Sequence, residues 1–326
     1  MYLGIDLGGT RIKISLFAVD FTRVAMLTTP TESEKGSQRV VGNLIGSIQQ
    51  LLSQAQVDAE ELAAVGVGVP GLMDIERGIS LFSPNFAQWQ DVPIARLIAD
   101  ALGGVPVFID NDVRVNLFGE WYFGAGRQLK DLVLLTIGTG LGAGVVMEGR
   151  VLYGATGSAG EIGHLNMYRR GRPCACGSSG CLGRYVSGRG LIVTAREKIA
   201  VTAPGLLQEW LAQGKELTPA LLSEAYDKGD RIARETFEET GELLGYGLSS
   251  VINLYNPQRI IVGGGVAAAG ERLLGPARRI ISQHSLEISR RACDLVTAQL
   301  GSEAGMIGAA YYASQKLAGT PDYRQS

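Results

Sequence analysis

One pattern occurs twice in this 326-residue chain, and it constrains the fold more than any other feature of the sequence. The stretches LGIDLGGTRIKISLF (3–17) and LLTIGTGLGAGVVM (134–147) each read as a strand, a tight turn rich in Gly and Thr, and a second strand. No helical pattern follows either turn directly, so both predict β-hairpins rather than the strand–helix units of a dinucleotide-binding fold. Because each half of the chain carries one copy, we expect two related domains that face one ligand, with a boundary near 115–120.

Short apolar runs alternate with helical patterns along the rest of the chain. The runs that predict buried strands are 2–6, 63–69, 105–110, 131–138 and 259–264. The stretches that predict helices are 37–54, 93–102, 112–123, 188–199, 228–255 and 303–317. Strands that alternate with helices indicate an α/β fold.

The stretch 228–255 predicts an amphipathic helix, because apolar residues recur along it at spacings of about three to five. Its expected apolar face consists of Ile232, Phe237, Leu244, Leu248 and Val251. Since glycine weakens a helix interior, we expect this helix to break at Gly245–Gly247. The last helical stretch, 303–317, is compatible with packing on either domain.

Composition excludes several classes of protein. The formal net charge is −2 and no run of Lys or Arg forms a basic stripe, so we expect no nucleic-acid partner and no anionic membrane surface. No segment approaches the roughly 20 apolar residues that span a bilayer. Asp6 interrupts the stretch that a signal peptide would keep apolar. We therefore expect a cytoplasmic protein with no membrane anchor.

Glycine-rich turns at the ends of three expected strands suggest a nucleotide site. In DLGGT (6–10), the glycines allow backbone N–H groups to point at one anion, Thr10 adds a hydroxyl donor, and Asp6 suits Mg²⁺ or its water shell. The turn Gly138-Thr139-Gly140 would serve a second phosphate, and VGGGV (262–266) would let a base or ribose lie against bare backbone. The alternative is three plain glycine-rich turns. The lysine pattern of a P-loop is absent.

A candidate general base follows the expected strand 105–110. In IDNDVRVNLFGEW (109–121), Asn111 and Asp112 stand where a strand ends and a helix begins. A carboxylate there can accept the proton of a sugar hydroxyl as its oxygen attacks phosphorus. The alternative is that Asp112 only caps the helix, which aspartate does well. Asp110 and Arg114 flank the pair and affect its charge balance.

A candidate sugar-binding loop follows the GVPG turn at 68–71. SPNFAQW (83–89) offers Asn85 and Trp89, and an amide beside an aromatic face is a common way to bind a polyol. The alternative is a surface loop with a packed tryptophan.

Residues 161–183 hold three of the four cysteines and one of the two histidines. Cys174, Cys176 and Cys181, with His164 upstream, match the ligand set of a tetrahedral structural Zn²⁺, and the alternative is a set of buried thiols without metal. A disulfide between Cys174 and Cys176 would be strained. If one ring nitrogen of His164 binds zinc, the other can donate to a ligand oxygen, while Glu161 accepts from hydroxyls. The isolated Cys293 and His284 read as structural.

Taken together, these residues resemble the ROK family of sugar kinases (repressors, open reading frames and kinases) over about the whole chain. The shared motifs are DLGGT at 6–10, GVPG at 68–71, PN at 84–85, ND at 111–112, IGTGLG at 137–142, EIGH at 161–164, CACGSSGC at 174–181 and VGGG at 262–265. EIGH combined with the cysteine pattern is the most specific of them. The other motifs are shared more broadly with actin-like and sugar-kinase-fold ATPases.

The resemblance implies a two-domain, RNase H-like (actin/hexokinase-like) ATPase fold with a cleft between the domains. Residues 1–117 with 303–326 would form a small N-terminal domain, and 118–302 a large C-terminal domain with the zinc loop. The implied reaction is the ATP- and Mg²⁺-dependent phosphorylation of a hexose, glucose-like and at O6, or of an N-acylhexosamine. A homodimer is usual in the family.

The resemblance also implies residue roles, with Asp112 as the catalytic base. The implied sugar-binding residues are Gly71, Asn85, Asn111, Glu161 and His164. Those implied for nucleotide, phosphate and its metal are Asp6, Gly8, Gly9, Thr10, Lys13, Thr139, Gly140, Gly263 and Gly264. The implied ligands of structural Zn²⁺ are His164, Cys174, Cys176 and Cys181.

One position departs from the family pattern. Family kinases commonly have CLE after the third cysteine, with a glutamate that also holds the sugar, whereas this chain has Gly183 followed by Arg184. Losing such an acceptor costs about 1.5–3 kcal/mol if its hydroxyl partner stays unpaired. Either the substrate differs at that hydroxyl, another group substitutes, or the sugar site is weak.

The leading hypothesis is therefore an ATP-dependent sugar kinase. The rival is a non-catalytic or weakly active sugar sensor of the same fold, for which Gly183 is the best argument. Family repressors carry an N-terminal helix-turn-helix, for which the sequence before Asp6 leaves no room, so a sensor would be expected to act through a partner. An assembly ATPase of actin type leaves EIGH and the cysteine cluster unexplained.

Overall fold

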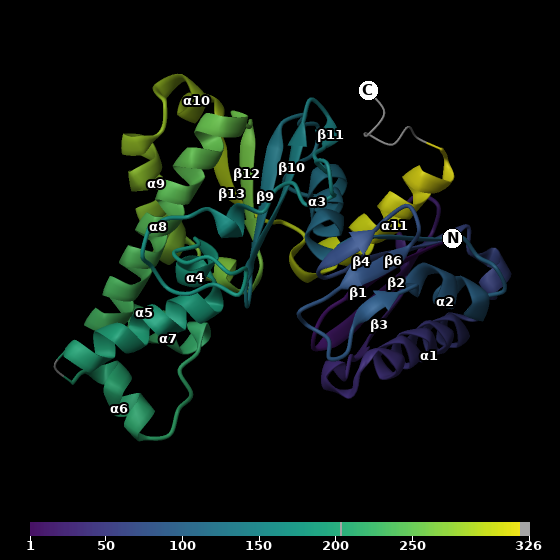
Figure 1. Ribbon diagram of the computed structural model, residues 1–326, viewed down its shortest axis with the longest axis horizontal. Helices are drawn as coiled ribbons and strands as arrows, with labels where there is room; N and C mark the ends of the chain where they lie inside the picture. The colour runs from purple at the N-terminus through teal and green to yellow at the C-terminus, as the bar shows by residue number, and fades with distance from the viewer. Residues whose placement is uncertain (203, 320–326) are drawn as a thin grey trace. The chain divides into compact units, whose positions relative to one another are not determined.

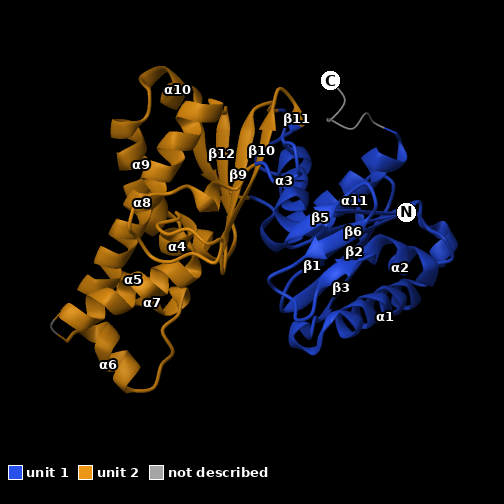
Figure 2. Cartoon of the chain, in the orientation of Figure 1, with its two compact units in different colours: residues 1–128, 151–159, 299–326 blue, residues 129–150, 160–298 orange. Residues whose placement is uncertain are grey.

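The computed structural model describes residues 1–202 and 204–319 (Figure 1). The chain divides into two compact units, coloured separately in Figure 2. Unit 1 consists of Met1–Gln128, Val151–Ala159 and residues 299–319, and unit 2 consists of the described residues of Leu129–Arg150 and Gly160–Ala298. The predicted division, with boundaries at 117 and 303, differs from this one. Its first boundary falls inside the helix Asp112–Phe123.

Unit 1 is built on a five-stranded sheet of order β3-β2-β1-β4-β8. Its strands are β1 (Tyr2–Leu7), β2 (Arg11–Phe17), β3 (Arg23–Pro30), β4 (Ala64–Val69) and β8 (Val107–Asn111). The first three form an antiparallel meander, so the predicted hairpin at 3–17 is confirmed. Strands β1, β4 and β8 are parallel, which brings their carboxyl ends to one edge of the sheet. A separate small sheet consists of β5 (Leu72–Asp74), β6 (Ile79–Phe82) and β7 (Gln90–Val92).

The two faces of this sheet are covered differently (Figure 1). Alternate residues of β1, such as Leu3 and Ile5, join the main core with residues of α1 (Ser37–Ala55) and α2 (Ile94–Ala101). On the other face, α11 (Ala304–Leu317) lies directly on paired glycines of the sheet, beside α3 (Asp112–Phe123). A Cβ on Gly4 or Gly66 would lie 1.9 Å from a backbone oxygen of α11. The absence of a side chain at these positions is therefore what lets the helix dock.

Unit 2 contains most of the second five-stranded sheet, of order β11-β10-β9-β12-β13. Its strands are β9 (Leu132–Ile137), β10 (Leu141–Met147), β11 (Arg150–Val151), β12 (Arg259–Gly263) and β13 (Asp294–Thr297). Strands β9 and β10 pair antiparallel, which confirms the predicted hairpin at 134–147. Strand β12 runs parallel to both β9 and β13, so the carboxyl ends of β9 and β12 also meet at one edge.

Most helices of unit 2 pack against one long helix, α8 (Arg231–Tyr255), whose main partner is α9 (Glu271–His284). The others are α4 (Gly183–Val186), α5 (Gly188–Val201), α6 (Leu206–Ala212), α7 (Pro219–Asp227) and α10 (Glu287–Ala292). The predicted break at Gly245–Gly247 is wrong, because α8 is continuous. A Cβ on Gly245 would meet Ile280 at 2.6 Å and one on Gly247 would meet Leu182 at 2.5 Å. These glycines thus allow close packing and do not end the helix.

The remaining predicted elements agree with the structure to within a few residues. The five predicted strands correspond to β1, β4, β8, β9 and β12, and the predicted apolar face of α8 is buried. The C-terminal helical stretch packs on unit 1 as α11. Within residues 1–202 and 204–319, no helix is both long enough and apolar enough to cross a membrane.

Candidate active site and metal centre

The first glycine-rich turn links β1 to β2 in unit 1. The Gly8 N–H donates to the carbonyl of Arg11 (3.0 Å), which closes the turn. Thr31 stabilises this turn through two hydrogen bonds. Its hydroxyl donates to the Gly8 carbonyl (2.7 Å), and its N–H donates to the Thr10 carbonyl (3.0 Å). Thr31 is fully buried, and sequence reasoning missed it because an isolated threonine after a strand carries no signal. Carbonyls of the turn are thus engaged within unit 1, a geometry that suits an anion at the tip.

Asp6 and Lys13 lie opposite each other in the β1–β2 register, with the Lys13 ammonium 3.7 Å from the Asp6 carboxylate. Burial raises the pKa of Asp6, and Lys13 opposes that effect. A Cβ on Gly305 would lie 3.0 Å from Asp6 Cγ and 3.2 Å from Asn116 Nδ2. The missing side chain at Gly305, near the start of α11, therefore leaves room for the Asp6 carboxylate.

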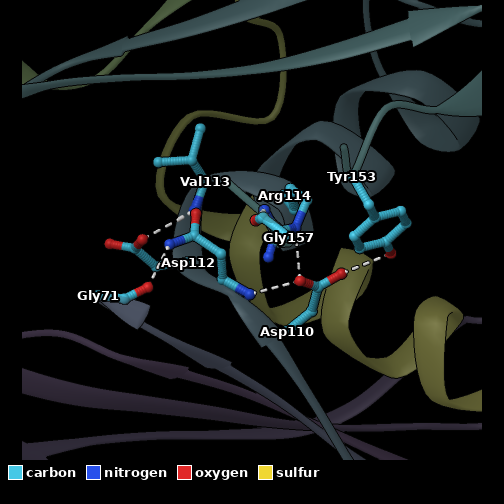
Figure 3. Close-up of polar contacts among 8 residues, drawn as sticks. Gly71, Asp110, Asp112, Val113, Arg114, Tyr153 and Gly157 are labelled. Carbon is cyan, nitrogen blue, oxygen red and sulfur yellow. Dashed lines mark hydrogen bonds and ion pairs between the residues drawn. The ribbon is translucent and has the colours of Figure 1, made fainter. Parts of the chain in front are cut away.

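The β8–α3 junction holds Asn111 and Asp112. Figure 3 labels Asp112 there, beside Val113. Asn111 is the residue that caps α3, since its Oδ1 accepts from the Val113 N–H (3.0 Å) and its Nδ2 donates to the Gly71 carbonyl (3.3 Å). Gly71 has φ of +102°, and a Cβ there would lie 2.1 Å from the Phe82 carbonyl oxygen. The amide of Asn111 thus connects the GVPG turn to the start of α3.

Asp112 is the first residue of α3, and the residue that caps this helix is Asn111, so the alternative that Asp112 only serves as the cap does not hold. Its Oδ1 accepts from the Val113 N–H (3.0 Å), while Oδ2 has no hydrogen-bond partner within the described part of the chain. Burial, and secondly the charge of Asp6, raise the pKa of Asp112 to about 6. A carboxylate with such a pKa is ionised at neutral pH and still basic enough to accept a proton.

The loop that carries Asn85 packs beside the first turn. A Cβ on Gly9 would lie 3.3 Å from the Cβ of Asn85, so glycine at the tip lets the loop approach. Asn85 is exposed. Trp89 is 3% exposed, packs on Phe86 and donates its ring N–H to the Ser80 hydroxyl (2.8 Å). Of the two interpretations of this loop, the packed tryptophan describes Trp89, and Asn85 remains available for a ligand.

Unit 2 brings two further glycine-rich turns together at the carboxyl ends of β9 and β12. Gly138 donates its N–H to the Gly140 carbonyl (3.0 Å), and Thr139 and Gly140 are exposed. Gly264 has φ of +88°, and a Cβ there would lie 2.5 Å from the Ile137 carbonyl oxygen. Gly263 pairs with Thr136 in the parallel register. Both turns therefore present bare backbone at the same sheet edge.

The four predicted metal ligands converge within unit 2. The ligand atoms of His164, Cys174, Cys176 and Cys181 all lie within 4.8 Å of one another. The Cys176 and Cys181 sulfurs are 3.7 Å apart, and Cys174 Sγ is 3.8 Å from His164 Nδ1. Tetrahedral zinc with its usual bond lengths requires edges of about 3.6–3.8 Å. The turn through GSSG closes by a hydrogen bond from the Cys174 N–H to the Ser178 carbonyl (2.9 Å). The donor set and its spacing therefore fit Zn²⁺.

The two ring nitrogens of His164 face different groups. Nδ1 is directed at the thiols, whereas Nε2 lies 4.0 Å from a carboxylate oxygen of Glu161, and both side chains are exposed. Gly183 starts α4 against the same turn, and a Cβ there would lie 3.2 Å from the Gly163 carbonyl oxygen. Any side chain at 183 would thus begin beside the backbone that joins Glu161 to His164. Arg184, next to it, keeps its Nε buried with no hydrogen-bond partner in the described chain.

A buried network behind Asp112 was recognised only in part from the sequence. Asp110 and Arg114 were expected to affect the charge of the junction, and they form an ion pair with Nε and Oδ1 2.6 Å apart. Tyr153, whose hydroxyl donates to Asp110 Oδ2 (2.8 Å), was missed. No motif signals Tyr153, because 42 residues separate it from Asp110 in the chain.

The ROK family profile matches residues 2–316 of this chain. A glucokinase of Thermotoga maritima is 33% identical over 317 residues, which cover 97% of this chain and 98% of that protein. A xylose repressor of Caldicellulosiruptor bescii is 29% identical over 325 residues, 98% of this chain and 80% of the repressor. The crystal structure of a ROK glucokinase from Streptomyces griseus, in complex with glucose and AMPPNP, superposes with a TM-score of 0.81 at 31% identity, covering 96% of this chain and 99% of that one.

The two sheets, each with its glycine-rich hairpin, and the superposition define a protein of the actin/hexokinase-like fold, as the sequence predicted. The chain belongs to the ROK family.

Proposed function

We propose that this protein transfers the γ-phosphoryl group of ATP to a glucose-like hexose, at O6, with Asp112 as the general base. A sugar-kinase activity is supported by the near full-length likeness to glucokinases. The choice of base rests on one observation above all: Asp112 combines a free carboxylate oxygen with a pKa raised to about 6. In that state Asp112 can take the proton of the attacking hydroxyl as the oxygen–phosphorus bond forms.

The phosphates of ATP would be held by glycine-rich turns. Gly9 and Thr10 would supply backbone and hydroxyl donors in unit 1, where Gly8 shapes the turn because its own N–H is engaged by the Arg11 carbonyl. Thr139 and Gly140 would supply donors in unit 2. The exposed backbone at Gly264, next to the buried Gly263 at the end of β12, would lie against the nucleoside. Asp6 would hold the Mg²⁺ that accompanies ATP, with Lys13 balancing charge beside it.

The polar groups proposed to bind the sugar are Asn85, Asn111, Glu161 and His164, with the Gly71 carbonyl orienting the Asn111 amide. Zinc bound by His164 and the three cysteines would stabilise the loop 161–183. With all four ligands supplied by protein, the metal leaves no open position and acts as structural support. His164 would then keep Nε2 and its proton for a sugar oxygen.

Gly183 bears on which sugar is accepted. The carboxylate that family kinases commonly place at this position is absent, and Glu161 remains as the acidic group of the loop. We propose that the preferred hexose makes fewer charge-assisted hydrogen bonds here, which weakens binding at one hydroxyl.

The first experiment is a substrate panel with the zinc-loaded protein. ADP release with Mg-ATP is measured on glucose, mannose, fructose, allose, GlcNAc and ManNAc, for the native chain and for Asp112→Asn. We expect turnover on glucose or a close relative, and a loss of at least about a hundredfold in the variant, since a positioned base contributes about 10²–10⁴. Undiminished turnover in Asp112→Asn would remove Asp112 from the role of base.

A second candidate function is a weakly active or non-catalytic sugar sensor that acts through a partner. Gly183 and the likeness to a xylose repressor over 98% of this chain favour it. Sugar binding in calorimetry with no ADP release on any sugar of the panel would support the sensor over the kinase.

A further inference from the structure

Asp110 is a fully buried carboxylate one residue before the Asn111–Asp112 pair. Its Oδ1 accepts from Arg114 Nε and from the Asn111 N–H, each at 2.6 Å. Its Oδ2 accepts from the Tyr153 hydroxyl at 2.8 Å. Figure 3 shows Asp110 between Arg114 and Tyr153, so both oxygens are in use inside the protein. A buried charge that is fully paired in this way is costly to disturb, because any lost partner leaves it uncompensated.

Arg114 extends the network to a second point. Its NH1 donates to the Gly157 carbonyl (2.8 Å), and its guanidinium lies 4.9 Å from the centre of the Tyr153 ring. Tyr153 and Gly157 both belong to Val151–Ala159, the segment that returns to unit 1 between two stretches of unit 2. This segment, which contains no helix or long strand, is thus fastened to the β8–α3 junction at two places.

The direction of each contact is set by chemistry. Burial, and secondly the charge of Asp110, raise the pKa of Tyr153 well above its usual value, so the phenol stays protonated and donates. The Asn111 N–H is held by Asp110 while the Asn111 side chain caps α3. The backbone on the N-terminal side of Asp112 is therefore constrained by both Asp110 and Asn111.

We propose that Asp110, Arg114 and Tyr153 form a positioning network that holds Asp112 in its reactive geometry by fastening the segment 151–159 to the β8–α3 junction. The inference rests on the proposed role of Asp112 as general base. None of the three residues needs to touch sugar or nucleotide for this role. A misplacement of the base lowers the rate of the chemical step and leaves nucleotide binding largely unchanged.

The test compares Tyr153→Phe and Arg114→Lys with the control Tyr2→Phe. Tyr153→Phe removes the hydroxyl that donates to Asp110 Oδ2 and keeps the ring. Arg114→Lys keeps the charge, but a single ammonium group cannot reproduce the fork between Asp110 and Gly157. Tyr2 lies in the same unit with its ring stacked on Phe21 and no hydrogen bond from its hydroxyl in the described chain.

Two quantities are measured for each folded variant: kcat and KM for ATP and sugar, and amide hydrogen exchange of a peptide covering 151–160. For Tyr153→Phe and Arg114→Lys we expect faster exchange in that peptide and a kcat lower by about tenfold, with KM for ATP within about twofold. Tyr2→Phe should match the native protein in both.

The outcomes separate this inference from the proposed base. If Asp112→Asn is inactive while Tyr153→Phe and Arg114→Lys exchange faster at full kcat, the segment is anchored but positions nothing, and the inference is overturned. Native-like exchange in both variants overturns the anchoring itself. If Asp112→Asn keeps its activity, the proposed base fails, whatever the exchange data show for 151–159.

Discussion

Replacing Asp112 by Asn should make the folded protein more stable and inactive at once. Burial raises the pKa of this carboxyl from 3.8 to about 6. The folded state therefore binds more protons than the unfolded chain between about pH 4 and pH 6, and stability falls as pH rises through that window. Above pH 6 the ionised Asp112 carboxylate destabilises the folded state by the full amount. About two pKa units correspond to about 3 kcal/mol, which is an upper value for a half-buried group.

The Asn side chain has the same shape and can still accept from the Val113 N–H, but it carries no charge. We expect Asp112→Asn to raise the free energy of unfolding by about 2–3 kcal/mol at pH 8 and to leave it unchanged near pH 3.5. Urea denaturation at both pH values measures the difference. The control is Asp100→Asn, in an exposed ion pair with Arg96, where we expect less than about 1 kcal/mol at either pH.

Equal stabilities of the native protein and Asp112→Asn at pH 8 would refute the reasoning, since the raised pKa would then have no counterpart in folding. A variant destabilised at both pH values would do the same.

Three further predictions concern the base, the metal and the packing of unit 1. The kcat/KM of the native enzyme should decline below an apparent pKa of about 6, leaving about a tenth of its plateau value at pH 5 in a pH–rate profile. A plateau that extends to pH 5 would speak against Asp112 as the base. The purified protein should contain one zinc per chain by elemental analysis, and Cys176→Ser should lose it together with about tenfold or more of the activity; full zinc occupancy in that variant would contradict the ligand set. Gly66→Ala should lower the free energy of unfolding by about 3 kcal/mol or more, because the new methyl group would lie 1.9 Å from the Ala309 carbonyl oxygen. Gly46→Ala should raise it by about 0.5–1 kcal/mol, because Gly46 is exposed within α1 and nothing lies near its Cβ position. Thermal melts in which Gly66→Ala is the more stable of the two would refute this.

Local patterns predicted a large part of the fold. Strand and helix positions were predictable because apolar residues of β1, β4, β9 and β12 form short continuous runs bounded by Gly or Asp. The paired hairpins were predictable because the same turn chemistry recurs. The break in α8 was predicted wrongly, because helix propensity does not include packing against residues that are distant in the sequence. Gly245 and Gly247 are where Ile280 and Leu182 pack, and that packing outweighs the propensity cost.

Residues of the candidate site were likewise predictable where they lie close together in the sequence, and not where they act through tertiary contacts. Glu161, His164 and the cysteines lie within 21 residues, so their spacing carried the information. Thr31 and Tyr153 act at a distance along the chain on backbone or buried charge, and nothing in their immediate sequence marks them. The division into units was also out of reach of local patterns, because the segment 151–159 is assigned to unit 1 by tertiary contacts alone.

The docking of α11 on Gly4 and Gly66 has a consequence for how the chain is made. The sheet of unit 1 is complete once β8 has been synthesised, yet the face at these glycines stays uncovered until the whole of unit 2 and then α11 have followed. During synthesis, the residues of unit 2 are therefore complete while unit 1 still lacks the helix that covers this face of its sheet. The first unit to be translated is thus the last to be finished, and a premature stop that removes α11 would damage the opposite end of the sequence.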